Sequence, residues 1–431
     1  MRKRGLLALI LVCALLLSTG CSLIAKNEEV DRQTVIIEAA GKTFTKGDVQ
    51  AETDALLDYY AYLYPMYYGV DFDPTNEATI EATREEAING LVEMAVVEKK
   101  IGEMGLDQFT AEEEAEMEAA VSEQYDSYVE FVKGYALADT ELTGDALQAA
   151  IDEQMLAMGY GTKEQMMETE RLTRAQNRLV DSVISTVTVS DEEIRAEYDY
   201  RLFNAKATYE EYPYAYGIDL TNGTSGMYYA PAGYRYVKHI LINFNADDQT
   251  VIDDLNTQLA AKRNELATAQ DGDDEAAEKL GSEIVVLEAE LAAATEAAYA
   301  AIQPAIDEIQ QKLAAGESFE SLIDTYNQDP GMTSASQGYA VSAVSTNWVQ
   351  EFTDASMKLE NIGDISEPVR SSYGIHIIQY ASDIPEGEIS LEAVREELTQ
   401  ELLTMKQDST FISTLEKWVE EANAKIYLDR L

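Results

Sequence analysis

Histidine occurs only twice in this chain of 431 residues, and each one lies in a short run of aliphatic residues. His239 is followed by Ile-Leu-Ile, and His376 lies within Gly-Ile-His-Ile-Ile. Both runs predict strands, and because side chains alternate along a strand, each imidazole shares a face with apolar neighbours. A buried imidazole needs a hydrogen-bond partner, and the other histidine is the natural candidate. The pair therefore predicts a polar site inside an apolar core, although a single histidine is more often an ordinary core residue.

Three more motifs lie between the two histidine strands. They are Gly-Glu-Ser-Phe-Glu-Ser-Leu at 316–322, Tyr-Asn-Gln-Asp-Pro-Gly at 326–331 and Gly-Asp-Ile-Ser-Glu-Pro-Val at 363–369. In this order, the motifs and the histidine strands resemble the parvulin-type peptidylprolyl isomerases. Together with the segments on either side, the whole chain is similar to the PrsA-type extracytoplasmic foldases. The resemblance implies that residues 234–383 form a parvulin domain, in which helices wrap a small antiparallel sheet.

The resemblance also implies which residues carry the reaction. Asp329 falls where parvulins have the Asp or Cys that faces the histidine pair, so His239, Asp329 and His376 are the expected catalytic residues. The implied reaction is rotation about X-Pro peptide bonds, and amide resonance gives peptide-bond rotation a barrier of about 18–20 kcal/mol. Rotation makes and breaks no covalent bond. We therefore expect no metal and no cofactor, and we expect the three side chains to orient and polarise rather than to transfer protons.

The expected pocket for the substrate proline ring is apolar. Trp348 and Phe352 match the floor that holds the ring in parvulins. Ala340 stands at the wall and Tyr373 at the rim. Two departures are visible, because parvulins usually have Met or Val in place of this Trp, and bacterial parvulins commonly read Gly-Gly-x-Leu-Gly where 337–341 is Gln-Gly-Tyr-Ala-Val. An ordinary core role for Trp348 and Phe352 is left open.

The start of the chain has the pattern of an export signal. A basic start is followed by an apolar stretch at 6–17, which is too short to be a typical membrane span. Leu-Ser-Thr-Gly-Cys at 17–21 resembles a bacterial lipobox, with cleavage before Cys21 and lipidation of its sulfur. We therefore expect a signal peptide at 1–20, a polar tether at 21–33, and a lipid anchor on the extracytoplasmic face of the cell membrane. An uncleaved signal anchor is the alternative.

Acidic residues far outnumber basic ones, since 80 Asp and Glu against 31 Lys and Arg give a formal net charge of −49. Such a surface repels nucleic acid and anionic membrane, so we exclude nucleic-acid binding. Cationic clients or calcium are compatible with the charge, and so is a merely solvated acidic surface. Cys13 leaves with the signal peptide and Cys21 is modified, so no internal disulfide is expected. The fold must depend on its hydrophobic cores.

Residues 34–200 are expected to form most of a helical chaperone lobe. The segment is rich in Ala, Glu, Leu and Met, and its apolar stripes have helical spacing. Ser190 and Glu193 predict a capping box at the start of a further helix. The C-terminal segment, 384–431, is again mainly helical. Its last strand is expected to pair with the strand at 35–37 and so complete the lobe.

Two unusual segments flank the first histidine strand. Residues 201–233 belong to a Tyr-rich stretch, whose Gly, Asn and Pro content predicts a long loop or a region of short strands that links the lobe to the isomerase. The clustered tyrosines suit either interdomain packing or a grip on unfolded peptide. Beyond His239, apolar residues recur at heptad-like intervals on both sides of an acidic turn at 271–274. This pattern predicts an inserted antiparallel helical hairpin at about 247–300, which buries its own seam.

The sequence thus predicts an α+β protein with a mainly helical chaperone lobe and a parvulin domain that carries a helical hairpin. The predicted function is isomerisation of X-Pro bonds and chaperoning of exported polypeptides that contain proline. A catalytically inactive holdase on the same scaffold is the alternative. The expected partners are these polypeptides and, through the lipid on Cys21, the membrane. A homodimer is left open.

Overall fold

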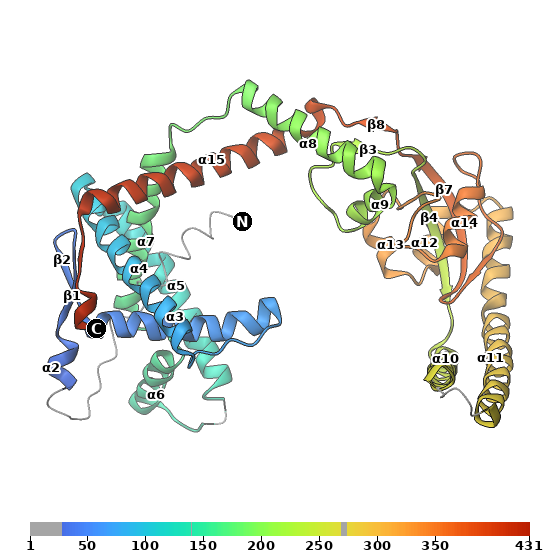
Figure 1. The fold of residues 1–431 in the computed structure, drawn as a ribbon, viewed down its shortest axis with the longest axis horizontal. Helices are drawn as coiled ribbons and strands as arrows, with labels where there is room; N and C mark the ends of the chain where they lie inside the picture. Colours follow the sequence, from blue (N-terminus) through green and yellow to red (C-terminus); the bar gives the residue numbers. More distant parts are fainter. Residues whose placement is uncertain (1–27, 139, 269–273) are drawn as a thin grey trace. The chain divides into compact units, whose positions relative to one another are not determined.

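The computed structural model describes residues 28–138, 140–268 and 274–431 (Figure 1). The predicted signal peptide and the predicted lipidation site at Cys21 lie outside these ranges, and so does most of the turn predicted at 271–274. Within the ranges described, no helix combines the length and the apolar composition needed to cross a membrane.

The described residues divide into two compact units. The first contains the residues up to Val189 together with Glu401–Leu431, and the second is Ser190–Gln400. Helix α15 (Leu391–Ala422) contributes to both units. Each unit combines helices with small antiparallel sheets, which confirms the predicted α+β class.

Five consecutive helices form most of the first unit. They are α3 (Lys46–Tyr68), α4 (Glu77–Met104), α5 (Ala111–Tyr135), α6 (Gly144–Ala157) and α7 (Lys163–Ile184). Three of them begin with a threonine in a capping box, in which the threonine hydroxyl accepts from the third helical N–H and that residue's side chain accepts from the threonine N–H. The pairs are Thr45 with Asp48, Thr110 with Glu113, and Thr162 with Gln165.

The two ends of the first unit meet in one sheet, with the strand order β2-β1-β9. The strands are β1 (Val35–Ala39), β2 (Lys42–Thr45) and β9 (Lys425–Ile426). Ile37 is opposite Ile426 in an antiparallel register, which confirms the predicted pairing of the first and last strands. Within the predicted tether, Glu28–Arg32 form helix α2.

The sheet of the second unit has the order β5-β4-β7-β6 and is antiparallel throughout. Its strands are β4 (Arg235–Asn243), β5 (Tyr339–Val341), β6 (Val369–Ser371) and β7 (Gly374–Asp383). His239 pairs with Ile378 and His376 pairs with Leu241. The two histidines are therefore diagonal neighbours on one face of the sheet, as strand periodicity predicts.

Helices cover both faces of this sheet. One face packs Ile240 and Ile377 against α11 (Asp274–Ala314) and α12 (Phe319–Tyr326). The other face, which carries the histidines, packs Val237 and Ile378 against α14 (Gln350–Lys358). The short helix α13 (Pro330–Ser334) follows α12.

The inserted hairpin is confirmed as α10 (Ala246–Thr268) followed by α11, which continues past Pro304 into the domain. The hairpin was expected to bury its own seam, and it also contributes to the core of the domain. Ile252 of α10 belongs to the same buried cluster as the strand residues Ile240 and Ile242, and Leu291 packs against that cluster. The base of the hairpin is therefore part of the domain core.

The Tyr-rich stretch contains a short strand, which was one of the two expectations, but most of it is helical. It contains most of α8 (Asp191–Glu211), all of α9 (Pro213–Thr221) and strand β3 (Tyr229–Ala230), which pairs with β8 (Gly387–Glu388). Pro213 occupies the first turn of α9, where its missing N–H costs nothing. Three tyrosines supply the buried contacts that a loop would lack, and they are Tyr209, Tyr216 and Tyr234. The capping box predicted at Ser190 and Glu193 starts α8 and is confirmed.

Candidate functional site

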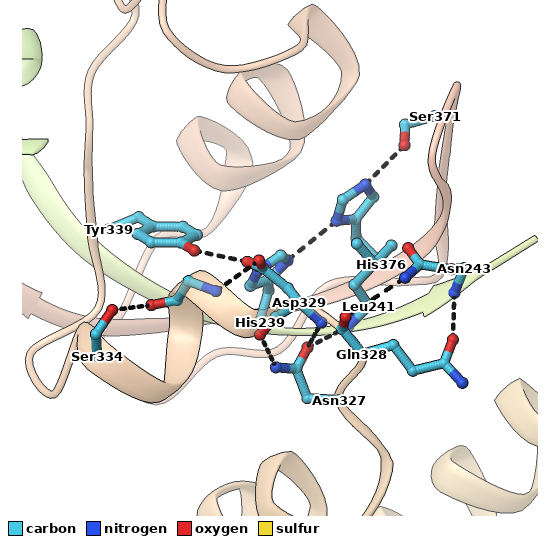
Figure 2. Close-up of polar contacts among 11 residues, drawn as sticks. His239, Leu241, Asn243, Asn327, Gln328, Asp329, Ser334, Tyr339, Ser371 and His376 are labelled. Atoms are coloured by element: carbon cyan, nitrogen blue, oxygen red, sulfur yellow. Dashed lines mark hydrogen bonds and ion pairs between the residues drawn. The ribbon is translucent and has the colours of Figure 1, made fainter. Parts of the chain in front are cut away.

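The two histidines form the centre of a buried polar site between β4 and β7 (Figure 2). Their Nδ1 atoms are 3.0 Å apart, and their rings stack with an interplanar angle of 15°. His239 is 3% exposed and His376 is 4% exposed. The predicted contact between the two imidazoles is confirmed.

Asp329 closes one end of the site. Its Oδ2 lies 2.7 Å from His239 Nε2 and also accepts the hydroxyl hydrogen of Tyr339 at 2.6 Å, while Oδ1 accepts the Gly331 N–H at 3.0 Å (Figure 2). The hydrogen bond with His239 is the largest cause that lowers the pKa of Asp329 to about 2, and the other two bonds act in the same direction against burial. The carboxylate is therefore charged at neutral pH.

Ser371 closes the other end. Its Oγ lies 2.7 Å from His376 Nε2 and accepts the N–H of Tyr373 at 3.2 Å. Burial, and secondly the nearby His239, lower the pKa of His376 to about 3, so this ring is neutral at physiological pH.

These partners fix one direction for the whole chain of hydrogen bonds. A carboxylate only accepts, so His239 donates from Nε2 to Asp329 and its neutral form has Nδ1 free to accept. His376 then donates from Nδ1 to His239, and its Nε2 accepts from the Ser371 hydroxyl. In this arrangement each ring nitrogen of the pair has a hydrogen-bond partner.

The segment before Asp329 is bound to the edge of β4, which explains how the carboxylate is positioned. The Asn327 side chain accepts the Leu241 N–H at 3.0 Å and donates to the Asp329 carbonyl at 2.7 Å. Gln328 accepts the Asn243 N–H at 2.7 Å through its side chain, and its own N–H donates to the Leu241 carbonyl at 2.9 Å (Figure 2). One backbone bond and two side-chain bonds thus join the loop to β4, and they hold Asp329 opposite His239.

An aromatic group lies beside the polar chain. The buried ring of Phe352 lies 5.1 Å from the His239 ring and 5.4 Å from the His376 ring, centroid to centroid. Trp348 is half-buried, 6.0 Å from Phe352, and stacks on Tyr339 at 4.4 Å with an interplanar angle of 24°. The structure therefore brings Trp348 and Phe352 together next to the histidines, as predicted.

The predicted wall residue needs a correction. Ala340 packs into the cluster of Tyr209, Tyr216 and Tyr234, and only its carbonyl contacts Trp348, by accepting the indole N–H at 3.0 Å. Because side chains alternate along β5, the residue that faces the histidines is its neighbour Tyr339.

The glycine shared with that family pattern has a local reason. Gly338 has φ +100°, a region that L side chains rarely adopt, and an added Cβ would collide with the Val237 carbonyl. Gly331 is restricted in another way, since an added Cβ would collide with the Tyr339 hydroxyl. The hydroxyl contact with Asp329 thus depends on a glycine next to it.

Tyr373 has an exposed side chain at the surface, and only its backbone takes part in the polar chain. Among the residues that the structure describes, no group of three or more His, Cys, Asp and Glu side chains could hold a metal ion. The site therefore consists of a fixed polar chain beside aromatic rings, and it offers positioning and electrostatics.

Three residues of the site were not predicted from the sequence. No role was predicted for Tyr339, because its neighbour Ala340 was assigned to the wall of the pocket. Strand alternation would have made both residues candidates, one on each face of β5. Asn327 lies within the motif at 326–331 but was given no role, and Ser371 ends β6 with a short side chain that no sequence pattern marks. Their roles follow only from the hydrogen bonds.

Residues 284–382 match the PPIC-type PPIASE domain family. The matched range begins inside α11 and omits β4 with His239, because the hairpin separates this strand from the rest of the domain. The fold joins the two parts.

The chain is similar to several foldases and chaperones. Foldase protein PrsA of Oceanobacillus iheyensis is 36% identical over 129 residues, which are 29% of this chain and 42% of that protein. Foldase protein PrsA 4 of Bacillus cereus is 40% identical over 107 residues, 24% of this chain and 36% of that protein. Chaperone SurA of Alkalilimnicola ehrlichii is 34% identical over 120 residues, 28% of this chain and 26% of that protein. The match thus spans less than half the length of these curated relatives.

Two solved structures of similar proteins cover most of the chain. PrsA from Bacillus subtilis has 16% sequence identity and a TM-score of 0.21, and it covers 91% of this chain and 92% of its own. Foldase protein PrsA from Streptococcus pneumoniae has 16% identity and a TM-score of 0.22, with coverages of 80% and 88%.

Proposed function

We propose that this chain, which carries a PPIC-type PPIase domain, isomerises X-Pro peptide bonds and chaperones exported polypeptides outside the cytoplasmic membrane. The observation that supports the proposal best is the unbroken polar chain from Ser371 through both histidines to Asp329, which lies against the ring of Phe352. Four polar groups in fixed positions beside an apolar ring suit a reaction that needs positioning and no covalent step.

The apolar side of the site is suited to a proline ring. Phe352 is 3% exposed, so its position is fixed by packing, while Trp348 is half-buried and has a flat aromatic face. A ring bound there anchors one side of the peptide bond while the other side turns. An enzyme accelerates this turn only if it binds the twisted amide more tightly than either planar form.

The polar side acts through fixed dipoles and one charge. Uncatalysed prolyl isomerisation takes tens to hundreds of seconds. The charged Asp329 holds His239 in one tautomer, and Ser371 does the same for His376 from the other end. Groups held in this way need no reorganisation when the amide twists, which is how a preorganised site lowers a barrier. We assign these residues an orienting and electrostatic role.

The proposed location rests on the sequence before the described residues. Cleavage before Cys21 and lipidation of its sulfur would attach the protein to the outer face of the membrane. The intact mass of the membrane-bound protein should show acyl groups on an N-terminal Cys21. Membrane recovery of an unmodified Cys21→Ala variant in equal yield would show a signal anchor instead.

A second candidate function is a holdase without turnover, and Tyr339 is the observation that favours it. Its ring lies flat on Trp348 and its hydroxyl binds Asp329, so it occupies space directly beside the aromatic floor. If this ring blocks the substrate, Tyr339→Ala should raise turnover from background. If the ring is part of a working pocket, the same change should lower turnover.

The decisive experiment is a protease-coupled assay of cis-to-trans turnover on a proline tetrapeptide. Turnover above background that falls strongly in Phe352→Ala supports the isomerase. Background turnover by the unaltered chain, together with suppression of client aggregation, would leave only the holdase.

A further inference from the structure

The second half of α3 is a long exposed aromatic surface in the first unit. Up to Leu57 the helix is anchored by buried side chains, and from Tyr59 onward it continues to Tyr68 with most of its large side chains in solvent. Seven of the exposed large apolar residues in the described chain fall between positions 59 and 70. We call Tyr59, Tyr62, Met66, Tyr67 and Tyr68 the tyrosine surface.

The tyrosine surface rests on a rigid base. Tyr60 donates its hydroxyl hydrogen to Glu86 of α4 at 2.6 Å, which ties the two helices together. The chain turns at Gly69 and brings Phe72 back against Tyr60 and Tyr64, with ring centroids 5.8 Å and 5.1 Å apart. The inner rings therefore support the helix, and the outer rings are left free for a partner.

The surroundings of the tyrosine surface are strongly acidic. Between positions 54 and 86 the chain has eight carboxylates and a single cation, Arg84. Asp58 lies one helical turn before Tyr62, Asp71 follows the end of the helix, and both are exposed. An aromatic ring attracts cations through its face, and nearby carboxylates add to that attraction.

This charge selects among the partners that could cover the rings. A second copy of the chain would bring the same carboxylates against each other, and an anionic membrane would be repelled by them. A polypeptide segment with lysine or arginine between apolar residues meets both requirements, because its apolar groups pack on the rings while its cations face the carboxylates. Tyrosine suits such binding because its large, rigid ring loses little conformational entropy.

We propose that the tyrosine surface of α3 binds cationic, unfolded segments of client polypeptides. The proposal rests on the proposed chaperone function and adds to it a location and a charge preference. The binding site is separate from the histidine pair, which belongs to the other unit.

The test uses the full chain and two labelled, unstructured peptides that differ only in charge. Both have apolar residues spaced by Gly and Ser, and one carries lysines where its twin carries glutamates. Fluorescence anisotropy should show that the lysine peptide binds at low salt and that the glutamate twin does not. Tyr62→Ser/Tyr67→Ser should weaken binding of the lysine peptide about tenfold, as expected when central aromatic contacts are lost.

Tyr200→Ser/Phe203→Ser is the matched control. These side chains on α8 are 63% and 71% exposed, against 66% and 68% for Tyr62 and Tyr67, so the control removes similar aromatic area from the other unit. It should leave binding unchanged. A second variant, Asp58→Asn/Asp71→Asn, should weaken lysine-peptide binding about threefold and reduce its salt dependence.

Three results would overturn the proposal. The first is an equal loss of lysine-peptide affinity in the α3 and α8 variants, and the second is equal affinity of the unaltered chain for the two peptides. The third is loss of self-association in the α3 variant, measured by sedimentation, which would show that a second copy of the chain covers the tyrosine surface. Turnover of the proline tetrapeptide should be the same in all variants, and circular dichroism should show that they are folded. If the unaltered chain lacks turnover but binds the lysine peptide through Tyr62 and Tyr67, the isomerase proposal fails and this one stands.

Discussion

Tyrosine is used in opposite ways in two regions of this molecule. In the second unit, Tyr209, Tyr216 and Tyr234 are buried, and the hydroxyls of Tyr209 and Tyr234 have hydrogen-bond partners. On α3 of the first unit, Tyr62 and Tyr67 are mostly in solvent. The same residue type therefore builds a core in one region and a free surface in the other.

Local composition alone therefore does not reveal the role of an aromatic cluster. Residues 198–236 suggested either packing or a grip on peptide, and the structure shows that their central rings pack within the second unit. The cluster at 59–68 is even richer in tyrosine, yet most of its rings are exposed in the part of the chain that the structure describes. What separates the two is the presence of apolar partners distant in the sequence, such as Ala340 beside Tyr234.

The largest effect should come from the buried region, at Phe352. Phe352→Ala removes a ring that is 3% exposed and contacts both histidines. The free energy of unfolding of the second unit should therefore fall by about 3–5 kcal/mol. Urea denaturation and turnover measured in the folded range check this. Phe352→Leu is the matched control, and it should lose much less stability and much less turnover. Equal behaviour of the two variants would contradict a ring-specific role.

The histidine pair should behave as one unit. His239→Asn or His376→Asn alone leaves a buried partner unsatisfied, which costs about 1–3 kcal/mol in each case. The double change should cost clearly less than the sum, and a double-mutant cycle from urea denaturation measures the difference. Tyr234→Phe combined with His376→Asn is the control, because these changes do not share a partner and should be additive to about 0.5 kcal/mol. Additivity within the histidine pair would break this account of the site.

Acid should weaken the histidine site before the rest of the domain. The pKa of His376 is about 3 in the fold and 6.5 as its ordinary value, so below pH 6.5 the unfolded chain binds a proton that the folded chain does not. The contribution of neutral His376 to the free energy of unfolding is fully present above pH 6.5. It is lost as the pH falls toward 3, with a slope of at most about 1.4 kcal/mol per pH unit. Asp329 adds a second loss between pH 3.8 and about 2.

The comparison that isolates the acid effect is the unaltered chain against His376→Asn. Unfolding free energies measured from pH 7 to pH 4 should converge as the pH falls, because the variant has no proton to take up at this position. Parallel curves would mean that His376 is protonated equally in the folded and unfolded states.

A pair of hydroxyl deletions sharpens the contrast between the two tyrosine regions. The Tyr234 hydroxyl donates to the Pro213 carbonyl at 2.7 Å and accepts the Gly217 N–H at 3.2 Å. Tyr234→Phe leaves those buried groups without their partner and should cost about 1–3 kcal/mol by urea denaturation. Tyr62→Phe should change stability by less than about 0.5 kcal/mol, as an exposed site allows. A comparable cost at both positions would remove the distinction.

Shortening the hairpin should have only a small effect on the second unit. Deleting residues 256–290 and joining the ends with a short Gly/Ser linker keeps Ile252 and Leu291, which pack in the core. The free energy of loop closure depends only weakly on loop length. The second unit should therefore still unfold in a cooperative thermal transition, with a free energy of unfolding changed by no more than about 1 kcal/mol, and turnover should be kept. A deletion that also removes Ile252 should be clearly worse. Loss of the transition in the shorter deletion would show that the distal hairpin is structural.

Much of the fold could be predicted from the sequence because the signals are local. Strand alternation placed both histidines on one face, heptad spacing predicted α10 and α11, and the Ser190 capping box marked the start of α8. Short-range physics determines each of these features. The pairing of β1 with β9 was also predictable, because an isolated strand at each end needs a partner.

The errors came from features that depend on distant contacts. The helices α8 and α9 form although their sequence is rich in turn residues, because Tyr209 and Tyr216 find buried partners. Ala340 was chosen in place of Tyr339, and a shift of one position in a strand reverses the face on which a side chain lies. The exposed rings of α3 could not be predicted, since exposure is the lack of a partner elsewhere in the unit.

The most direct test of the central claim is exchange NMR on a proline tetrapeptide with a catalytic amount of the unaltered chain. The account predicts that cis and trans signals of the X-Pro bond exchange faster than in peptide alone, and that Phe352→Ala removes the acceleration while circular dichroism shows a folded protein. Exchange at the uncatalysed rate with the unaltered chain would contradict it, and the histidine site would then be a structural remnant in a chaperone that only holds its clients.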